Sequence, residues 1–441
     1  MRFEETVRYL LSLGVETLTI KLGLRNTELL LSELGNPQKF FPSVQIAGTN
    51  GKGSTAVVLD SICRAAGLKA GLYTSPHLIS ITERIKLDGQ EISKERFSHY
   101  ATEVRGAAEK LIADGQFEAL PTFFEQVTAI ALLAFREDQV QLAILETGLG
   151  GRLDATSVAS AQVVAITPIA KDHEEYLGET LESIAAEKAA IIRPGVTAIV
   201  APQTPEAMNV ILRQCERVKV KPILELCNAT VQSVTPQGRL RASFKTNLDL
   251  YEDVLVGLNG RHQITNVSVA IRVAESLRSA GFDISHSAIV KGIETARHPG
   301  RLEIWQGCPA TLFDGAHNPS GASVLRQYLE EFVAMPVTMV FGAMRDKDLE
   351  QMASILFPFA RLLVLTKLDS VRSASVAELE KVAFPIVEPE KVISTVSVAD
   401  AIRKAMEITP PNGLICFCGS LYLIGEAQAL ISKSSAAEVH S

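Results

Sequence analysis

A glycine-rich segment near the N-terminus combines one lysine with two hydroxyl residues that follow it, at a spacing suited to phosphate binding. Its sequence is Gly-Thr-Asn-Gly-Lys-Gly-Ser-Thr over residues 48–55, and it follows an apolar run that begins near Val44. Glycines let backbone N–H groups converge on an anion, and the helix-compatible segment that follows adds its N-terminal dipole. Lys52 would reach the outer phosphates of a nucleotide, and Ser54 or Thr55 could contact a Mg²⁺ ion. The segment therefore predicts a phosphate-binding loop.

The spacing of this loop differs from that of the common P-loop motif. Only two residues separate Gly48 from the Gly51-Lys52 pair, and Gly53 stands before the hydroxyl residues. A tight turn between a strand and a helix that binds nothing is the alternative. We favour the phosphate loop, because such turns seldom place a lysine between two glycines ahead of Ser-Thr.

Two further strand-like runs end in side chains that could serve the same site. Leu142–Glu146 ends in a carboxylate before a glycine-rich turn, and Val163–Thr167 leads towards His173. In a doubly wound sheet, ligands bind beyond the carboxyl ends of the strands, so Glu146 and His173 should face the same crevice as Lys52. A carboxylate oxygen suits a hard cation that bridges phosphates. Taken singly, a turn-capping glutamate and a surface histidine are the alternatives.

Two other residues depend on their neighbours for a functional interpretation. Ser75 follows the short apolar run Ala70–Tyr73 and could supply another oxygen to the metal, although by itself it indicates an ordinary Ser-Pro turn. Lys188 comes late in a helical segment, directly after Glu187. From the residues alone, we expect Lys188 to be an exposed helix lysine paired with a nearby acid.

Composition limits the class of protein. The chain has 441 residues, of which 47% are hydrophobic and 21% charged, and its net charge is −7. This length predicts two or three domains, and the negative charge argues against binding to nucleic acid or an anionic membrane. No apolar run reaches the roughly eighteen residues of a membrane-spanning helix, and acidic residues stand where a signal peptide needs basic ones. Six scattered cysteines without zinc-ligand spacing complete the prediction of a cytoplasmic protein with free thiols.

Alternating apolar runs and helical patterns supply the elements that must position these residues. They predict a doubly wound, P-loop-type α/β domain with a parallel sheet over residues 1–297, interrupted by a small β excursion at about 222–258. A Pro-Gly hinge at Arg297–Arg301 ends the preceding helix. The pattern then restarts, which predicts a smaller Rossmann-like α/β domain over residues 298–441.

The predicted strands are Val44–Ala47, Leu142–Glu146, Val163–Thr167, Ala198–Ala201, Ala310–Asp314, Val337–Gly342, Arg361–Thr366 and Gly413–Cys418. The predicted helices are Ser54–Ala66, Thr122–Arg136, Leu181–Ile192, Gln263–Ala280, Ser320–Phe332, Leu349–Leu356 and Ser397–Ile408.

Seven motifs in one order resemble those of the folylpolyglutamate synthase and dihydrofolate synthase family, which belongs to the Mur-ligase-like ATP-dependent amide ligases. The resemblance covers about residues 20–430. The motifs are Gly48–Ser54, Thr74–His77, Glu146–Thr156, Glu187-Lys188, Arg261–Asn266, Phe313–Pro319 and Gly419–Glu426.

The resemblance implies cofactors and a role for individual residues. It implies ATP and Mg²⁺, with two metal ions and K⁺ as a further cofactor. Lys188 would carry an N6-carboxylate, which turns a cation into an anion able to bind the second Mg²⁺. The implied catalytic residues are Lys52, Lys188 and His317, and the implied metal ligands are Ser75, Glu146 and His173. The implied ATP-binding residues are Asn50, Gly51, Lys52, Gly53, Ser54, Asn266, Arg301 and Asp314. The implied pterin-binding residues are Thr122, Phe123, Phe124, Glu125, Leu153, Asp154 and Ala155, with Leu22–Arg25 as a further segment.

The sequence departs from the family pattern close to one of these residues. An apolar pair usually precedes the Asp-His pair, whereas Ala170 and Lys171 stand here. Lys171 therefore adds a positive charge beside the predicted metal ligand His173.

The implied reaction is ATP-driven addition of L-glutamate to dihydropteroate, to reduced folates or to both. A substrate carboxylate would attack the γ-phosphate, and the amine of glutamate would then attack the acyl phosphate, with release of ADP and phosphate. The implied partners are these small molecules, and the chain is expected to be a monomer. A muramyl-peptide ligase of the same superfamily, a P-loop phosphotransferase or NTPase, and a non-catalytic nucleotide-binding protein are the alternatives. The joint presence of Lys52, Glu146, His173 and Lys188 speaks against the last of these.

Overall fold

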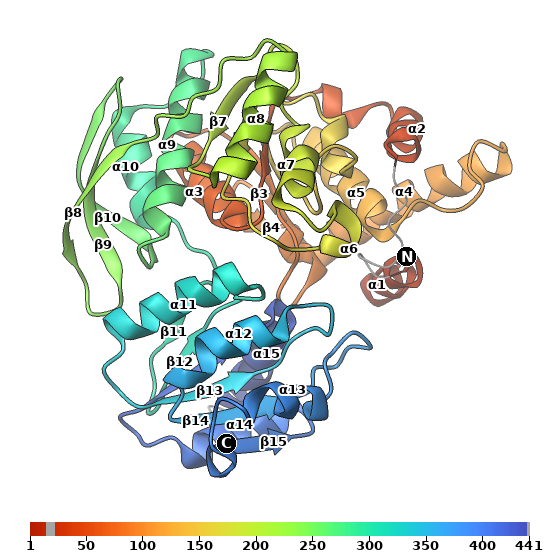
Figure 1. Ribbon diagram of the computed structural model, residues 1–441. Coiled ribbons are helices and arrows are strands. Elements are labelled where there is room, and N and C mark those ends of the chain that lie inside the picture. The colour runs from red at the N-terminus through yellow and green to blue at the C-terminus, as the bar shows by residue number, and fades with distance from the viewer. Residues whose placement is uncertain (15–22, 439–441) are drawn as a thin grey trace.

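The chain folds into two lobes built on separate sheets (Figure 1). The computed structural model describes residues 1–14 and 23–438. A seven-stranded sheet and a three-stranded sheet belong to the N-terminal lobe, which comprises α1 to α10, and a six-stranded sheet forms the C-terminal lobe, which comprises β11 to α15. The parallel doubly wound α/β class predicted from the sequence is confirmed, together with the β excursion and the second sheet.

The strands of the N-terminal lobe are β1 (Ser43–Ala47), β2 (Ala70–Tyr73), β3 (Ile85–Leu87), β4 (Gln90–Glu91), β5 (Leu142–Glu146), β6 (Val163–Ile166), β7 (Thr197–Val200), β8 (Asn228–Val234), β9 (Arg239–Lys245) and β10 (Leu250–Asn259). Its helices are α1 (Phe3–Ser12), α2 (Arg25–Glu33), α3 (Lys52–Ala65), α4 (Lys94–Ala113), α5 (Phe123–Glu137), α6 (Glu174–Leu177), α7 (Leu181–Ala189), α8 (Pro205–Arg217), α9 (Gln263–Ser279) and α10 (His286–Thr295).

The strands of the C-terminal lobe are β11 (Glu303–Trp305), β12 (Ala310–Phe313), β13 (Val337–Phe341), β14 (Leu362–Thr366), β15 (Val392–Thr395) and β16 (Leu414–Cys418). Its helices are α11 (Pro319–Phe332), α12 (Leu349–Leu356), α13 (Val376–Ala383), α14 (Val398–Ile408) and α15 (Leu421–Glu438).

The seven-stranded sheet has the order β4-β3-β2-β5-β1-β6-β7 and is parallel from β2 to β7. Its central strands β1 and β5 are buried along their whole length and mostly apolar, because helices cover both faces. Along β5, Leu142 and Ile144 pack into the core beneath α3, α9 and α10, whereas Ala143 and Leu145 pack into the core beneath α4 and α5. This alternation fixes the orientation of the strand, and Glu146 is its last residue, at the carboxyl end of the sheet.

The β excursion is an antiparallel sheet that rests on α9 and α10 (Figure 1). Leu240, Ala242 and Phe244 alternate along β9 and are buried, whereas the residues between them are partly exposed. This period of two is the pattern of a sheet with one face on a core and the other in solvent.

The segment from Ala296 to Arg301 joins α10 to β11 and forms neither a helix nor a strand, as the Pro-Gly hinge predicts. The exact domain boundary between residues 297 and 298 stays a prediction. Helix α3 begins at Lys52, two residues earlier than expected, and α7 ends at Ala189, three residues earlier than expected. Among the described residues, none of the helices combines the length and the apolar character needed to cross a membrane.

Candidate active site

The glycine-rich loop joins the carboxyl end of β1 to the first turn of α3. The first N–H groups of a helix have no partner within the helix, so this turn presents donors and a positive dipole end to an anion. Lys52 Nζ donates to the carbonyls of Gly48 and Thr49 at 3.1 Å each. The loop itself is fixed, because the N–H groups of Thr49 and Asn50 both donate to the carbonyl of Pro168. The geometry is that of a phosphate-binding loop.

Two glycines of the loop are required by close contacts. Gly51 has φ of 87°, a left-handed conformation that other residues seldom adopt, and a Cβ there would lie 2.2 Å from Oδ1 of Asn266. A Cβ on Gly53 would lie 2.9 Å from the ring of His298 and 3.4 Å from Oε2 of Glu146. The loop therefore approaches the hinge and the β5 carboxylate more closely than a side chain would allow.

Gly53→Ala should weaken ADP binding on the order of 10- to 100-fold, since the added methyl group must displace His298 or Glu146. Calorimetric titration with ADP measures this effect. Gly106→Ala in the middle of α4 is the matched control, because nothing lies within 4 Å of the added Cβ. Unchanged ADP affinity in Gly53→Ala would show that the close packing against the loop has no bearing on nucleotide binding.

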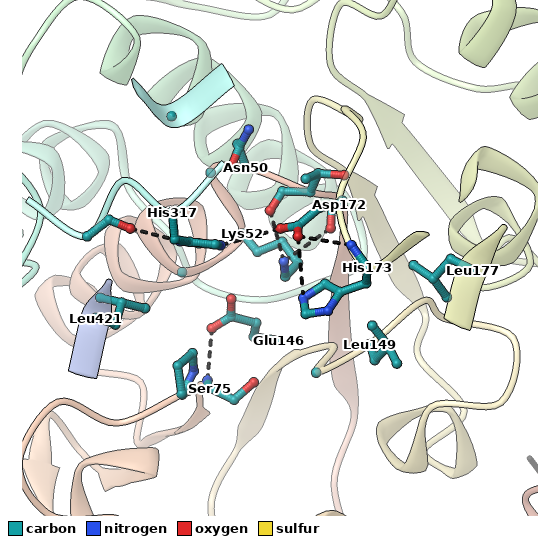
Figure 2. A pocket seen from close by; sticks show the side chains of 18 of the residues that line it. Asn50, Lys52, Ser75, Glu146, Leu149, Asp172, His173, Leu177, His317 and Leu421 are labelled. Carbon is teal, nitrogen blue, oxygen red and sulfur yellow. Dashed lines mark hydrogen bonds and ion pairs between the residues drawn. The ribbon is translucent and has the colours of Figure 1, made fainter. Parts of the chain in front are cut away.

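The three predicted metal ligands lie at the carboxyl ends of three parallel strands of one sheet, β2, β5 and β6, as strand-end reasoning predicts (Figure 2). Ser75 follows β2, Glu146 ends β5 and His173 follows β6. Glu146 is 5% exposed, and its Oε2 accepts the N–H of Ser75 at 3.1 Å. Burial raises the pKa of Glu146, while Lys52 and Arg301 oppose that shift.

His173 has a left-handed backbone conformation, with φ of 54°, directly before α6. Burial lowers the pKa of its imidazole to about 4, although the neighbouring Asp172 carboxylate opposes the shift. The ring is therefore neutral near pH 7 and keeps a nitrogen lone pair available for a cation.

Lys188 is buried rather than exposed, so the expectation drawn from the residues alone is wrong. It is 4% exposed, and its Nζ donates to the carbonyl of Gly48 at 2.9 Å. Glu187, its expected partner, pairs instead with Arg152 at 2.9 Å. Burial, reinforced by the charge of Lys52, lowers the pKa of Lys188 to about 7. The reason is tertiary: the end of α7 turns towards the phosphate loop.

Arg301 of the hinge and Asp314 of the C-terminal lobe lie beside the same cavity as the phosphate loop. The carboxylate of Asp314, just after β12, accepts the N–H groups of Leu302 at 2.9 Å and Ala316 at 3.0 Å. Nη1 of Arg301 is buried without a hydrogen-bond partner among the described residues. A Cβ on Gly315 would lie 1.9 Å from that nitrogen, so only glycine leaves room for the guanidinium. A buried donor without a partner is the kind of group that a ligand oxygen satisfies.

The segments implied in pterin binding, residues 122–125 and 153–155, form the pterin end of the site, and two of their polar side chains are already engaged. Glu125 Oε2 accepts the N–H and the hydroxyl of Thr122 at 2.7 and 2.8 Å, which forms a capping box at the start of α5. Asp154 accepts the N–H groups of Gly148 and Leu149, both at 2.9 Å. These carboxylates therefore shape the loops, and Phe124 presents its ring beside Gly148.

A single cavity of about 360 Å³ brings most of the predicted residues together. Every predicted catalytic, ATP-binding and metal residue lines it. Of the pterin set, only Phe123 does not line it, since its ring is buried beneath the guanidinium of Arg84 at 5.2 Å. Gly23 also lines the cavity, whereas Leu22 lies outside the described residues.

Sequence reasoning missed several residues that line this cavity. Asp172, Lys347, Arg372 and His298 belong to it, and Ser54 Oγ lies 3.1 Å from Nδ1 of His298. Lys347 follows the carboxyl end of β13, so the strand-end argument applied to the second sheet could have found it. His298 had no comparable signal, because the hinge motif indicates only a turn.

The predicted metal ligands suit Mg²⁺ only if phosphate oxygens of the substrate supply further ligands. Among the residues that the structure describes, no three His, Cys, Asp or Glu side chains converge to hold a metal by themselves. Ser75, Glu146 and His173 offer a hydroxyl, a buried carboxylate and a neutral imidazole. A cation that keeps several of its ligands from substrate phosphates needs no more than this from the protein.

Comparison with known proteins identifies the family. A family model for the Mur ligase middle domain matches residues 46–274, and one for the Mur ligase glutamate ligase domain matches residues 300–421. A dihydrofolate synthase/folylpolyglutamate synthase of Bacillus subtilis is 35% identical over 413 residues, covering 92% of this chain and 94% of the relative. The chain belongs to the folylpolyglutamate synthase/dihydrofolate synthase family of Mur ligases. This membership confirms the class of ATP-dependent ligase that the motifs predict.

Another relative in this family is longer than the present chain. A probable bifunctional folylpolyglutamate synthase/dihydropteroate synthase of Haloferax volcanii is 34% identical over 450 residues. The match covers 100% of this chain but 52% of the relative, so the chain spans about half the length of that protein.

Solved structures of family members have the same fold. Mycobacterium tuberculosis folylpolyglutamate synthase complexed with ADP matches with a TM-score of 0.91 at 31% identity, covering 97% of this chain and 98% of that one. Escherichia coli FolC in complex with DHPP and ADP matches with a TM-score of 0.87 at 31% identity and covers 99% of both chains. A bifunctional folylpolyglutamate synthase/dihydrofolate synthase with Mn, AMPPNP and L-glutamate bound matches with a TM-score of 0.84 at 28% identity, covering 98% of both chains.

Proposed function

We propose that this chain adds L-glutamate to dihydropteroate, to reduced folates or to both, with hydrolysis of ATP to ADP and phosphate. The observation that carries the proposal is the single cavity in which the phosphate loop meets Arg301 and Asp314 from the hinge and the C-terminal lobe. The names of the relatives support the choice of a folate-type acid and glutamate, and the solved family members bind ADP, DHPP, Mn and L-glutamate.

In the proposed reaction, a carboxylate of the pterin substrate attacks the γ-phosphorus and displaces ADP. The amine of glutamate then attacks the acyl carbon, loses a proton, and expels phosphate as the amide bond forms. Lys52 and Arg301 would offset the negative charge that spreads over the transferring phosphoryl group, which is the largest contribution a protein makes to this chemistry. The apolar residues Phe124, Leu153 and Ala155 would hold the pterin, so that its carboxylate points towards the phosphate loop.

Ser75, Glu146 and His173 are the residues that would hold Mg²⁺. When bound, the ion would offset the negative charge of the phosphates and so reduce their repulsion of the attacking carboxylate. A second Mg²⁺ on an N6-carboxylated Lys188, and K⁺ as a further cofactor, remain part of the proposal. The low pKa of Lys188 supports the modification, since only a neutral amine reacts with CO₂. A monomeric state, a cytoplasmic location and a domain boundary at residues 297/298 also stay predictions.

Phosphate release in the presence of ATP and L-glutamate tests the proposal, with dihydropteroate and tetrahydrofolate compared as acceptors. Release that requires one of these acceptors supports the proposed ligation. Release without any acceptor would favour an NTPase, and release only with a muramyl peptide would favour the muramyl branch of the superfamily.

Glu146→Gln should raise the Mg²⁺ concentration needed for half-maximal ligation on the order of tenfold or more, because it removes a charged oxygen ligand while preserving the side-chain shape. A magnesium titration of the initial rate measures the change. Glu174→Gln serves as the control, since that exposed carboxylate pairs with Lys171 outside the cavity. An unaltered titration in Glu146→Gln would leave Glu146 as a turn residue.

A further inference from the structure

The two lobes meet along α11, and the contacts at its two ends differ in kind (Figure 1). Near its carboxyl end, Glu331 pairs with Arg261 at 2.5 Å, and Tyr328 donates to the carbonyl of Gln237 at 2.7 Å. The side chains of Arg261 and Glu331 are 54% and 35% exposed, so their ion pair contributes little to holding the lobes together. The contact at the amino end of α11 is more deeply buried.

At the amino end of α11, the carboxylate of Asp172 in the N-terminal lobe contacts three side chains of the C-terminal lobe, of which Figure 2 labels His317. Asp172 Oδ1 pairs with Nζ of Lys347 at 2.6 Å. Its other oxygen accepts Nδ2 of Asn318 at 3.2 Å and lies 3.4 Å from Nε2 of His317. The side chains of Asp172 and Lys347 are only 7% and 9% exposed, so water screens this pair little.

This cluster of Asp172, Lys347, His317 and Asn318 is linked both to the phosphate loop and to the predicted metal ligand His173. Asn318 Nδ2 also donates to Oδ1 of Asn50 in the phosphate loop at 3.1 Å, and Asn318 caps α11 by accepting the N–H of Gly321. Asp172 directly precedes His173.

We propose that Asp172 is a positioning residue that joins the two lobes beside the phosphate loop. Its contacts with Lys347, His317 and Asn318 hold the C-terminal lobe against the phosphate loop and against the strand end that carries His173. The inference rests on the proposed ligation, which requires groups from both lobes to lie around one substrate. Loss of the bridge should misplace those groups relative to the phosphate loop while leaving the pterin end of the cavity intact.

Asp172→Asn preserves the shape of the side chain and removes its charge. Its kcat for ligation should fall on the order of 10- to 100-fold, because small misplacements of reacting groups are costly. The dissociation constant of the pterin acceptor should change less than about twofold, since Phe124, Leu153 and Ala155 all belong to the N-terminal lobe. An equal loss in kcat and acceptor affinity would indicate general disruption and would overturn the proposal.

Asp346→Asn is a matched control. Asp346 lies 3.8 Å from the same Nζ of Lys347 and pairs with Arg372 at 2.8 Å, but all three residues belong to the C-terminal lobe. This variant removes a carboxylate beside Lys347 without breaking a link between the lobes, so its kcat should stay close to that of the wild type. A loss equal to that of Asp172→Asn would assign the effect to the local charge of Lys347.

A double-mutant cycle separates the bridge from an effect of Asp172 on His173 alone. If Asp172 acts through Lys347, the double variant Asp172→Asn/Lys347→Met should be no slower than the slower single variant. Multiplying losses would mean that the two residues act independently and would overturn the proposal. Should Asp172→Asn not fold, Lys347→Met compared with Asp346→Asn tests the same contact from the other lobe.

Hydrogen exchange tests the bridge independently of the reaction. In Asp172→Asn, amide exchange of residues 315–321 and 344–348 should increase, whereas residues 148–156 at the pterin end should be unaffected. Unchanged exchange in the first two segments would contradict the bridge even in an active enzyme. Absence of acceptor-dependent phosphate release in the wild type would instead contradict the proposed function. The exchange result would still show whether Asp172 joins the two lobes.

Discussion

Lys52→Ala should lower the rate of ligation by about 100-fold or more while leaving the fold intact. The lysine lies at the start of α3, and the backbone of the loop is also held by Pro168, so the loop keeps anchors that do not involve the Lys52 side chain. Nζ of Lys52 donates to the carbonyls of Gly48 and Thr49, and water can donate to these carbonyls once the amine is absent. The expected loss of ligation rate therefore measures the neutralisation of phosphate charge by Lys52 and not an effect on folding.

Initial rates of acceptor-dependent phosphate release, together with the thermal midpoint, measure this effect. Lys110→Ala is a suitable control, because that lysine pairs with Glu33 on the surface of α4. Lys52→Ala should also raise the pKa of Lys188, since the charge of Lys52 helps to lower it. Turnover close to that of the wild type would exclude the phosphate-loop assignment.

Lys188→Arg should abolish ligation although it retains both charge and approximate length. The proposed modification forms when the lone pair of neutral Nζ attacks the carbon of CO₂ and one N–H proton is released. With its pKa lowered to about 7, the Lys188 amine is mostly neutral above that pH, whereas an ordinary lysine is mostly protonated until far higher pH. Arginine stays protonated and cannot undergo this step.

Three measurements check the modification. Intact mass should show one added CO₂ in the wild type that disappears on exposure to acid, and bicarbonate at pH 8 should restore both the mass and the activity. Lys188→Ala should be inactive, with partial recovery in formate or acetate, because a small carboxylate can occupy the vacated space. Lys171→Arg, an exposed neighbour of the site, should remain active. An active Lys188→Arg variant would show that an unmodified cation suffices.

Lys52 and Lys188 show how far the role of a residue can be predicted from the neighbouring sequence alone. The chemistry of Lys52 was predictable because glycines, a lysine and hydroxyl residues are adjacent in the sequence, and the local backbone determines their arrangement. Lys188 looked like a surface residue, since the periodicity of a short helix does not reveal which loop will cover its end. Burial against Gly48 became visible only when residues 140 positions apart were placed together.

Several elements of the N-terminal lobe were also missed. The helix α4 and the short antiparallel strands β3 and β4 were not predicted, because charged residues interrupt the apolar pattern of α4 and β4 spans only two residues. By contrast, β1 and β5 were predicted at or within one residue of their bounds. Buried parallel strands are nearly continuous apolar runs, and such runs are distinctive even in a single sequence.

The sequence by itself determined the strand ends of the N-terminal lobe and therefore the meeting of Lys52, Glu146 and His173. Parallel strands send all their carboxyl ends to one edge, so alternating apolar segments are enough to place such residues together. The tertiary structure decided which residues of the C-terminal lobe lie beside Lys52, Glu146 and His173. Asp172 and Lys347 belong to none of the motifs, and Asn318 stands in the Phe313–Pro319 motif without any sign there of its partner. The contact of these three residues depends on the angle at which the two lobes pack along α11. That angle is set by long-range contacts, which no local pattern of residues encodes.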